Sequence, residues 1–144
     1  MNLLFSYTGR IGRGGWWLGY VLTMIIIAAI VGLGAYLVPW SEVMLRGPDG
    51  APLMTADGSY RLDPSNAKLI PMWIASAIGL LLGIWISFAV HTKRLHDRGF
   101  SGWWVLLALI PFFGAIWMLI TMGFFEGQQG PNQYGADPRG PIKA

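Results

Sequence analysis

The densest group of side chains able to do chemistry is the run His91–Arg98, which reads His-Thr-Lys-Arg-Leu-His-Asp-Arg. Its basic side chains can reach phosphate groups, and near an anionic membrane surface each contributes on the order of 1 kcal/mol. Asp97 can pair with Arg94, three residues earlier on a helix. It can also pair with Arg10 or Arg13 from the N-terminal segment. The run is therefore either a positively charged anchor with a solvated ion pair or a binding site for a headgroup, a ligand or a partner.

The same run gives little support to metal binding or catalysis. His91 and His96 are five residues apart, about 140° around a helix, so they do not share a face. Acid–base work by His96 with Asp97 would need a nucleophile and a substrate pocket, and the neighbouring sequence indicates neither. The chain has no cysteine, which excludes disulfides, thiolate metal sites and thiol catalysis. We expect no catalytic residue, no metal and no cofactor, and favour a non-enzymatic protein over an enzyme.

The elements that position this run are three long stretches without a charged residue, Gly14–Trp40, Leu69–Val90 and Gly102–Phe125. Each exceeds the roughly 18 apolar residues that mark a candidate transmembrane helix. Hydrophobic residues make up 54% of the 144 and charged residues 12%, too few to cover the surface of a soluble fold. We therefore predict an all-α membrane protein, a small bundle of about three transmembrane helices. Its single membrane domain is expected at 1–126, with spans of about 16–40, 69–90 and 103–125, a loop at 41–68, a connection at 91–102 and a flexible tail at 127–144.

The basic residues predict the orientation of these spans. Arg10 and Arg13 precede the first span, and Lys93, Arg94 and Arg98 lie in the short connection after the second. Because short cytoplasmic loops are enriched in Lys and Arg, we expect the N-terminus and this connection to be cytoplasmic and the 41–68 loop to face outward. The first hydrophobic run is too long for a cleaved signal peptide and lacks a small-residue cleavage site, so we interpret it as an uncleaved span.

Two regions leave alternatives open. Pro111-Phe112-Phe113-Gly114 interrupts the third stretch, because proline removes a helix hydrogen bond. We favour a single kinked crossing, which leaves the tail outside; the alternative is a re-entrant hairpin that returns the tail to the cytoplasm. In the 41–68 loop, two short extended runs around Asp57-Gly58 indicate either a short β-hairpin or an unstructured connector.

Small residues and tryptophans complete the pattern of the spans. A ridge of small residues, spaced by four along the second span, allows close packing against the first span or another copy; it consists of Ala75, Gly79, Gly83 and Ser87. Tryptophans gather near the span ends, where amphipathic rings sit at the membrane interface; these expected interface anchors are Trp16, Trp17, Trp40, Trp103 and Trp104. No ionisable residue lies in the middle of a span, which argues against a stand-alone pump.

Several blocks, taken in order, resemble the bacterial inner-membrane family catalogued as domain of unknown function 805. They are Gly9-Arg10-Ile11-Gly12-Arg13 with Trp16, Lys93-Arg94-Leu95-His96-Asp97, Ser101-Gly102-Trp103-Trp104, Pro111 with Gly114, and Asn132-Gln133-Tyr134-Gly135-Ala136-Asp137-Pro138. The resemblance covers nearly the whole chain apart from the 41–68 loop. It implies a small multi-pass protein of the bacterial inner (plasma) membrane with no assigned activity. Family members usually carry arginine where this chain has Lys93, and polar or charged residues near Gly12, Gly14 and Gly15.

Our leading hypothesis is a membrane component whose cytoplasmic face binds anionic lipid headgroups or a membrane partner. Its candidate residues are Arg10, Arg13, Lys93, Arg94 and Arg98 for charge, with His96 and Asp97 ordering the cluster. The tail block joins them only if the third stretch turns back. A transporter or channel subunit is the alternative, and a membrane-embedded enzyme acting on a lipid-linked substrate is the third. Expected partners are the bilayer with its anionic lipids and a second copy or another membrane protein, but no nucleic acid.

Overall fold

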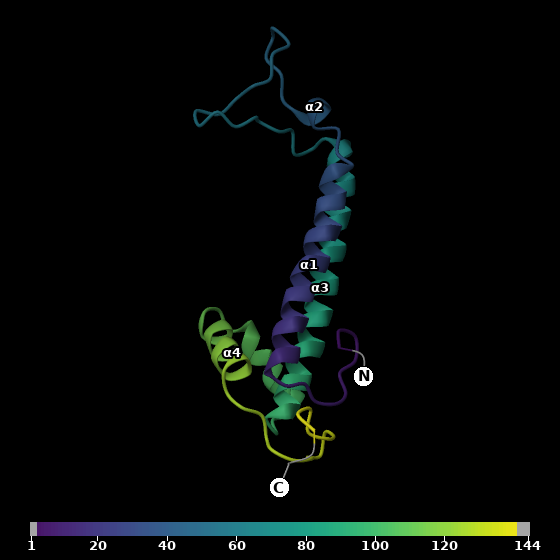
Figure 1. Ribbon diagram of the computed structural model, residues 1–144. Coiled ribbons are helices and arrows are strands. Elements are labelled where there is room, and N and C mark those ends of the chain that lie inside the picture. The colour runs from purple at the N-terminus through teal and green to yellow at the C-terminus, as the bar shows by residue number, and fades with distance from the viewer. Residues whose placement is uncertain (1–2, 141–144) are drawn as a thin grey trace. The chain divides into compact units, whose positions relative to one another are not determined.

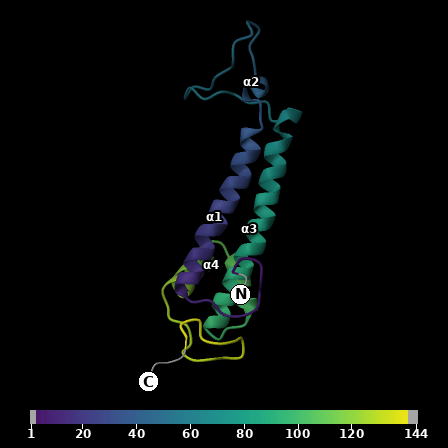
Figure 2. The ribbon, with the colours of Figure 1, turned by 45° about the vertical axis from the view of Figure 1, so that its right-hand side comes forward.

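The protein, described by a computed structural model over residues 3–140, folds as two units (Figures 1 and 2). The first unit contains the chain up to Ile25 and from Leu82 onward, and the second contains Ile26–Leu81. Two long helices, α1 (Arg13–Tyr36) and α3 (Ile70–Asp97), contribute a part to each unit. The remaining elements are α2 (Trp40–Val43) and the 3-10 helix η1 (Ala67–Leu69) in the second unit, and the 3-10 helix η2 (Gly102–Leu109) and α4 (Phe113–Gly123) in the first.

The helices α1 and α3 are long and apolar enough to span a membrane, and α4 is a shorter apolar helix. Only 17% of the most apolar window of α1 and 22% of that of α3 is buried within the protein. A core helix of a soluble protein would be mostly buried, whereas these helices expose large side chains such as Leu33, Leu81 and Trp85. The predicted all-α membrane fold is therefore confirmed, with two membrane-spanning helices and one shorter apolar helix.

Within the second unit, α1 gives way to a short connection. The backbone N–H of Leu37 donates to Leu33 at 3.2 Å, and Pro39, which has no N–H, then separates α1 from α2. Trp40 therefore opens a helix of its own rather than closing the first. Val38, Val43 and Leu69 form a small buried core beneath the loop, with Met72 packed against it.

The loop between α2 and η1 forms turns and isolated antiparallel bridges rather than a regular hairpin. Met44 pairs with Leu62 and Met54 with Tyr60, and Gly58 sits at a φ of +83° at the end of the turn that begins at Thr55. No strand forms within residues 3–140. The predicted pairing around Asp57-Gly58 is thus present only as single bridges.

Within each unit, the parts of α1 and α3 lie side by side, and small residues let them approach (Figures 1 and 2). In the second unit, a Cβ added to Gly34 would lie 2.3 Å from Ala75 Cβ, and one added to Gly79 would lie 3.5 Å from Val31. In the first unit, a Cβ on Gly19 would lie 2.9 Å from Val90. Ala75 and Gly79 therefore face α1 of the same chain. Of the two partners considered for the small-residue ridge, the first span and another copy, these residues contact the first span.

The third apolar stretch is broken where the sequence predicts. The helix η2 ends at Leu109 and α4 starts at Phe113, and Phe112 between them has a φ of +60°. Gly114 permits the tight turn, because a Cβ there would lie 1.9 Å from the Leu107 carbonyl oxygen. η2 and α4 pack against each other, so the chain doubles back at this point (Figure 1).

Of the two arrangements considered for this stretch, the structure has the hairpin and not the single kinked crossing that the sequence favoured. Residues after α4 return to Arg10, which donates hydrogen bonds to the carbonyl oxygens of Gln128 and Gly130 at 2.6 Å each. Proline accounts for a break in the helix but not for the direction in which the chain leaves it. That direction depends on the positive φ of Phe112 and on the close approach at Gly114, which proline alone does not reveal.

Candidate functional site

Asp97, the last residue of α3, is the centre of a buried ionic network in the first unit. One carboxylate oxygen, Oδ2, pairs with Arg94, one turn earlier on the same helix. The other, Oδ1, accepts hydrogen bonds from Nε and Nη2 of Arg10 at 3.2 and 3.1 Å. Buried carboxylates require such partners, because an unpaired buried charge is strongly destabilising. Of the three predicted partners, Arg94 and Arg10 both pair with Asp97, whereas Arg13 pairs with Glu126.

The other N–H groups of Arg94 and Arg10 donate hydrogen bonds to backbone carbonyl oxygens. Arg94 donates from Nε to Met122 at 2.8 Å and from Nη2 to Phe125. Arg10, besides its bonds to Gln128 and Gly130, donates to the carbonyl oxygen of Gly135 at 3.3 Å. One carboxylate balances only one of the two positive charges, and the carbonyl dipoles stabilise the other. The network therefore fastens both the end of α4 and the segment after it to α3.

His96 holds the next part of that segment. Its imidazole stacks on the ring of Tyr134, with the ring centroids 3.9 Å apart and the planes inclined by 4°. Its backbone carbonyl oxygen accepts a hydrogen bond from Asn132 Nδ2 at 2.9 Å, and the ring atom Nδ1 lies 3.3 Å from the Gly9 carbonyl oxygen. Three sequence-distant blocks, around residues 9–13, 93–98 and 127–139, thus meet in one place.

Lys93 is turned away from solvent as well, whereas Arg98 is partly buried. Lys93 is fully buried, and its Nζ donates to the Leu3 carbonyl oxygen. The Arg98 guanidinium lies between the rings of Phe100 and Phe125, at 5.3 and 5.1 Å from their centroids, and donates to Thr121. Lys93 therefore belongs to the protein interior, while Arg98 packs between aromatic rings at its edge.

Arg13 and Arg139 are the half-exposed cations of this region. They line a cleft of about 150 Å³ together with Gly12, Arg94, Asp97, Glu126 and Gly127. Arg13 pairs with Glu126 at 3.2 Å and donates to the Phe124 carbonyl oxygen. Gly127 must be glycine here, because a Cβ would lie 1.9 Å from Asp97 Oδ2. Together with Arg10 and Asp137, which pair with lining residues, the cleft has four arginines against three carboxylates, so its surroundings carry a net positive charge.

Asp137 positions Arg139 at the edge of the cleft. Its carboxylate accepts hydrogen bonds from Nε and Nη2 of Arg139 at 3.0 Å each and from the backbone N–H of Gly130 at 2.8 Å. The Arg139 side chain and backbone hold the pKa of Asp137 well below its ordinary value of 3.8. The pair is therefore fully charged at neutral pH.

The structure separates the predicted site residues into buried and accessible groups. Arg10, Lys93, Arg94 and Asp97 are buried, whereas Arg13 is half exposed. Glu126, Gly127, Asp137 and Arg139 were missed as contributors, because a segment rich in Gly, Pro and Gln has little to bury and was expected to be flexible. Only Asp137 lay in the block Asn132–Pro138 that the family resemblance included, and no sequence signal pointed to the other three.

The predicted interface tryptophans also separate into exposed and buried residues. Trp17, Trp40, Trp103 and Trp104 are partly or largely exposed. Trp16 is only 2% exposed and stacks on Tyr20, with 5.9 Å between the ring centroids. Its position near a span end is shared with the others, but it faces the protein interior.

The fold and this site describe a small helical membrane protein whose terminal segments are joined by a buried ionic network. The chain belongs to the family described as Protein of unknown function (DUF805), whose model matches residues 4–136. It is 31% identical over 134 residues to Inner membrane protein YhaH of Escherichia coli K12, covering 93% of this chain and 88% of that one. It is 30% identical over 158 residues to Uncharacterized protein YiiR of the same strain, covering 93% and 86%.

A further relative matches over a shorter region. Inner membrane protein YhaI of Escherichia coli K12 is 44% identical over 52 residues, which are 35% of this chain and 42% of that protein. No solved structure matches this chain.

Proposed function

We propose that the protein is a multi-pass component of the bacterial inner membrane that binds a phosphate-bearing anionic headgroup in the cleft beside Arg13 and Arg139. Two of its full-length relatives carry the names Inner membrane protein YhaH and Uncharacterized protein YiiR, and the first of these names supports the location. The positive-inside rule supports a cytoplasmic N-terminus, because Arg10 and Arg13 lie beside the basic end of α3. The proposed site would then face the cytoplasmic leaflet.

The observation that carries the proposal is the placement of three arginines around one small cleft. Arg94 is buried and fixed by Asp97, whereas Arg13 and Arg139 are half exposed. Planar guanidinium groups with fixed orientation bind phosphate through paired hydrogen bonds. A volume of about 150 Å³ equals that of about five water molecules, which is enough for a tetrahedral phosphate group.

Glu126 is the group that an incoming anion would displace. Its pair with Arg13 at 3.2 Å is exposed on both sides, so the pair contributes little stability by itself. Arg13 can therefore exchange Glu126 for phosphate at low cost. Arg94 and Asp97 would stay in place, because their partners are inside the protein.

The test measures binding of short-chain phosphatidylglycerol, phosphatidylcholine and inorganic phosphate to the full chain in detergent. We expect phosphatidylglycerol to bind more tightly than phosphatidylcholine. The double variant R13Q/R139Q should lose about 30-fold in affinity, since each cation contributes about 1 kcal/mol. The matched control R46Q/R61Q removes two arginines from the 41–68 loop and should bind as the unaltered protein does.

Three results separate the sources of the anion. Preference for phosphatidylglycerol that R13Q/R139Q removes supports a lipid headgroup. Equal binding of inorganic phosphate and phosphatidylglycerol supports a soluble phosphate ligand at the same cleft. Equal binding of both lipids, or equal loss in R46Q/R61Q, contradicts the site.

A further inference from the structure

The hairpin formed by η2 and α4 exposes large apolar side chains on both of its arms and at its tip. No charged residue lies between Gly102 and Phe125. Phe112, at the tip, is 85% exposed, and Trp103, near the start of η2, is 79% exposed. In a membrane protein, a surface of this kind is covered by lipid acyl chains or by another protein.

Arg98 marks the base of this hairpin. Its guanidinium lies between the ring of Phe100, just before η2, and the ring of Phe125, just after α4. Arg94 also holds the end of α4, through the carbonyl oxygens of Met122 and Phe125. A charged side chain in the middle of a bilayer costs about 2.5–3.5 kcal/mol, so a base that holds two arginines belongs at a membrane surface.

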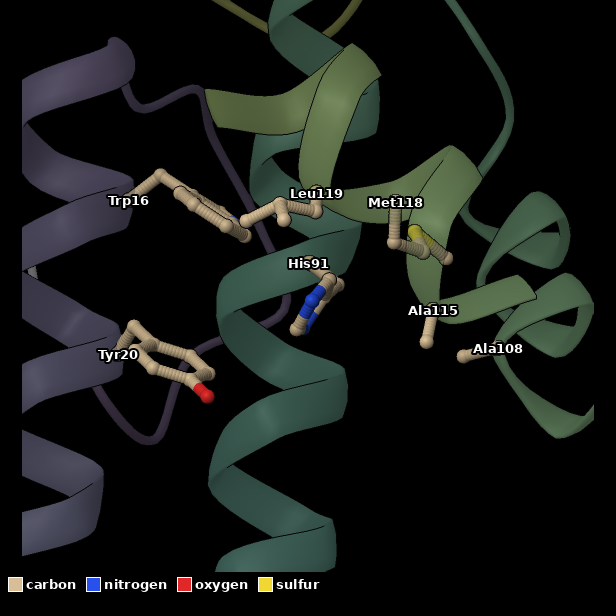
Figure 3. Close-up of a pocket in the computed structure, with 7 residues that line it drawn as sticks. All are labelled: Trp16, Tyr20, His91, Ala108, Ala115, Met118 and Leu119. Atoms are coloured by element: carbon tan, nitrogen blue, oxygen red, sulfur yellow. The ribbon is translucent and has the colours of Figure 1, made fainter. Parts of the chain in front are cut away.

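From this base the hairpin extends along α1 and α3. Near the base, a Cβ added to Gly123 would lie 3.3 Å from the ring of Trp16. Nearer the tip, Ala115 lines a pocket of about 330 Å³ together with Tyr20 and His91 (Figure 3). Tyr20 is one helical turn beyond Trp16, so α4 follows the direction of α1 away from the charged base.

Each arm is about half as long as a bilayer is thick. The eight residues of η2 extend about 16 Å at about 2.0 Å per residue. The 11 residues of α4 extend about 17 Å at about 1.5 Å per residue. The hydrocarbon core of a bilayer is about 30 Å thick. The tip at Phe112 therefore reaches no further than about the middle, and the hairpin lies in one leaflet.

The N-terminal segment lies along the same part of α3. The Tyr7 hydroxyl donates to the carbonyl oxygen of Trp85 at 3.1 Å, and the centroids of the two rings are 5.3 Å apart. Trp85 precedes Asp97 by 12 residues, about 18 Å of helix. In the second unit, α2 and η1 have only four and three residues, so among its described helices only the parts of α1 and α3 are long enough to cross a leaflet.

Exposed positions surround the hairpin instead of forming one face. Of the residues of η2, only Val105 is buried. On α4 the buried side chains follow one stripe that includes Met118 and Met122, whereas Ile116 and Ile120 are exposed. A second copy of the protein would cover a single face, whereas acyl chains cover every exposed side. The surface therefore fits lipid better than it fits a protein partner.

We propose that the η2–α4 hairpin inserts into the acyl chains of a single leaflet, the one next to the ionic network, and that the protein thereby favours membranes in which this leaflet is convex. A group that fills only one leaflet widens that leaflet relative to the other. A convex leaflet offers the extra area at the lowest cost, which makes such insertion sensitive to curvature. The proposal does not depend on headgroup binding in the cleft.

The first experiment measures the depth of the hairpin tip. The chain has no cysteine, so a nitroxide spin label attaches only to the cysteine of F113C or, as a control in the 41–68 loop, of Y60C. Electron paramagnetic resonance of the full chain in phosphatidylcholine vesicles measures collisions of the label with oxygen, which concentrates in the bilayer, and with a water-soluble nickel chelate. We expect the F113C label to meet mainly oxygen and the Y60C label mainly the chelate.

The other results at F113C overturn the proposal. Frequent collisions with the nickel chelate would show that the tip lies in water. Few collisions with either reagent would show that protein covers the tip, which would assign the surface to a second copy of the chain.

The second experiment measures the dependence on curvature. Q129C places a cysteine at an exposed position after α4, on the side of the ionic network, and a maleimide that cannot cross membranes labels it only where this side faces outward. In that orientation the hairpin lies in the outer, convex leaflet. We expect the ratio of outward to inward molecules to be at least threefold higher in small sonicated phosphatidylcholine vesicles than in large extruded ones.

A charge at the tip assigns this effect to the hairpin. F112D introduces a carboxylate that is costly in the middle of the bilayer, and aspartate adopts a positive φ more readily than most residues do. In the Q129C background, F112D should remove the dependence on vesicle size, and the matched variant Y60D in the loop should keep it. Thermal unfolding checks that each variant is folded, and I116D, at an exposed position of α4, replaces F112D if the latter does not fold.

Two results of this experiment overturn the proposal. One is the same orientation ratio in small and large vesicles. The other is a dependence on vesicle size that the charged hairpin variant retains. Because the vesicles contain only phosphatidylcholine, a failure of phosphatidylglycerol binding in the cleft would leave these results unchanged.

Discussion

The first unit has a buried network of ion pairs, and the second unit has an exposed ion pair. Both join basic side chains to a carboxylate, but they differ in how far water reaches the charges. Arg94 and Asp97 have side chains that are 0% and 3% exposed, and Arg10 completes their hydrogen bonds. Lys68 and Glu42 also form an ion pair, but their side chains are 48% and 55% exposed. Desolvation makes the buried charges costly unless all are paired, whereas water stabilises the exposed pair when it opens.

The two regions also differ in the sequence distance that their polar contacts bridge. In the 41–68 loop, Asp49, Asp57 and Asp63 accept hydrogen bonds from residues two positions away. In the first unit, Arg10 reaches Gly130, 120 residues later. Local contacts shape a turn, while the buried network determines where the C-terminal segment lies.

The largest expected effect comes from removing the charge at the centre of the network. D97N leaves Arg10 and Arg94 buried without a counter-charge, and we expect a loss of about 3–5 kcal/mol in unfolding free energy. Chemical denaturation of the detergent-solubilised protein measures it. E42Q removes the carboxylate of the exposed pair and should change stability by less than about 0.5 kcal/mol; equal effects would show that the two regions do not differ.

The substitution R10K should lower the unfolding free energy by a smaller amount. Lysine keeps the charge but cannot reach Asp97 and the carbonyl oxygens of Gln128 and Gly130 together, as the planar guanidinium does. We expect a loss of roughly 1.5–3 kcal/mol and faster proteolysis within residues 127–139. The same change in the loop, R46K, should leave cleavage of that segment unaffected, and unchanged cleavage in R10K would contradict the role of Arg10.

The sequence predicted much of the fold and only part of the site. Charge-free stretches predicted the apolar helices, and Pro111 predicted the break between η2 and α4. The spacing also placed Asp97 within reach of Arg94, and the side of the membrane expected for the N-terminus allowed a pair with Arg10 or Arg13. Burial could not be predicted, because the solvation of Lys93 or Arg94 depends on the segment after α4, whose composition indicates flexibility. Likewise, Trp16 has the same sequence context as Trp17, yet only packing decides which ring faces the interior.

Helix contact in the second unit should be sensitive to a single methyl group. G34A places a Cβ 2.3 Å from Ala75 Cβ, and overpacking of this kind costs about 1–3 kcal/mol. G32A is the matched control on the same helix, because nothing lies within 4 Å of a Cβ added there. The thermal unfolding temperature should be lower for G34A and unchanged or higher for G32A. A G34A variant that unfolds at the same temperature as the unaltered protein would contradict the close approach of the two helices.

The smallest effect should be the pH dependence of the segment that Asp137 and Arg139 hold. The folded-state pKa of Asp137 is lowered by Arg139, so its contribution to stability is fully present above its ordinary value of 3.8 and is lost as pH falls toward the lowered value. The backbone N–H of Gly130 donates to Asp137. Below pH 3.8, its protection from hydrogen exchange should decrease more than that of N–H groups in the rest of the fold. In D137N this pH dependence should disappear, and its persistence would assign it to another group.

The chain doubles back at Phe112, and the C-terminal segment thereby joins Arg10 and Asp97. Paired reporter fusions, active only in the cytoplasm or only outside it, test this directly when placed at each end of the chain. We expect both ends to report the same side of the membrane. Reporters on opposite sides would contradict the buried network and the cleft that depends on it.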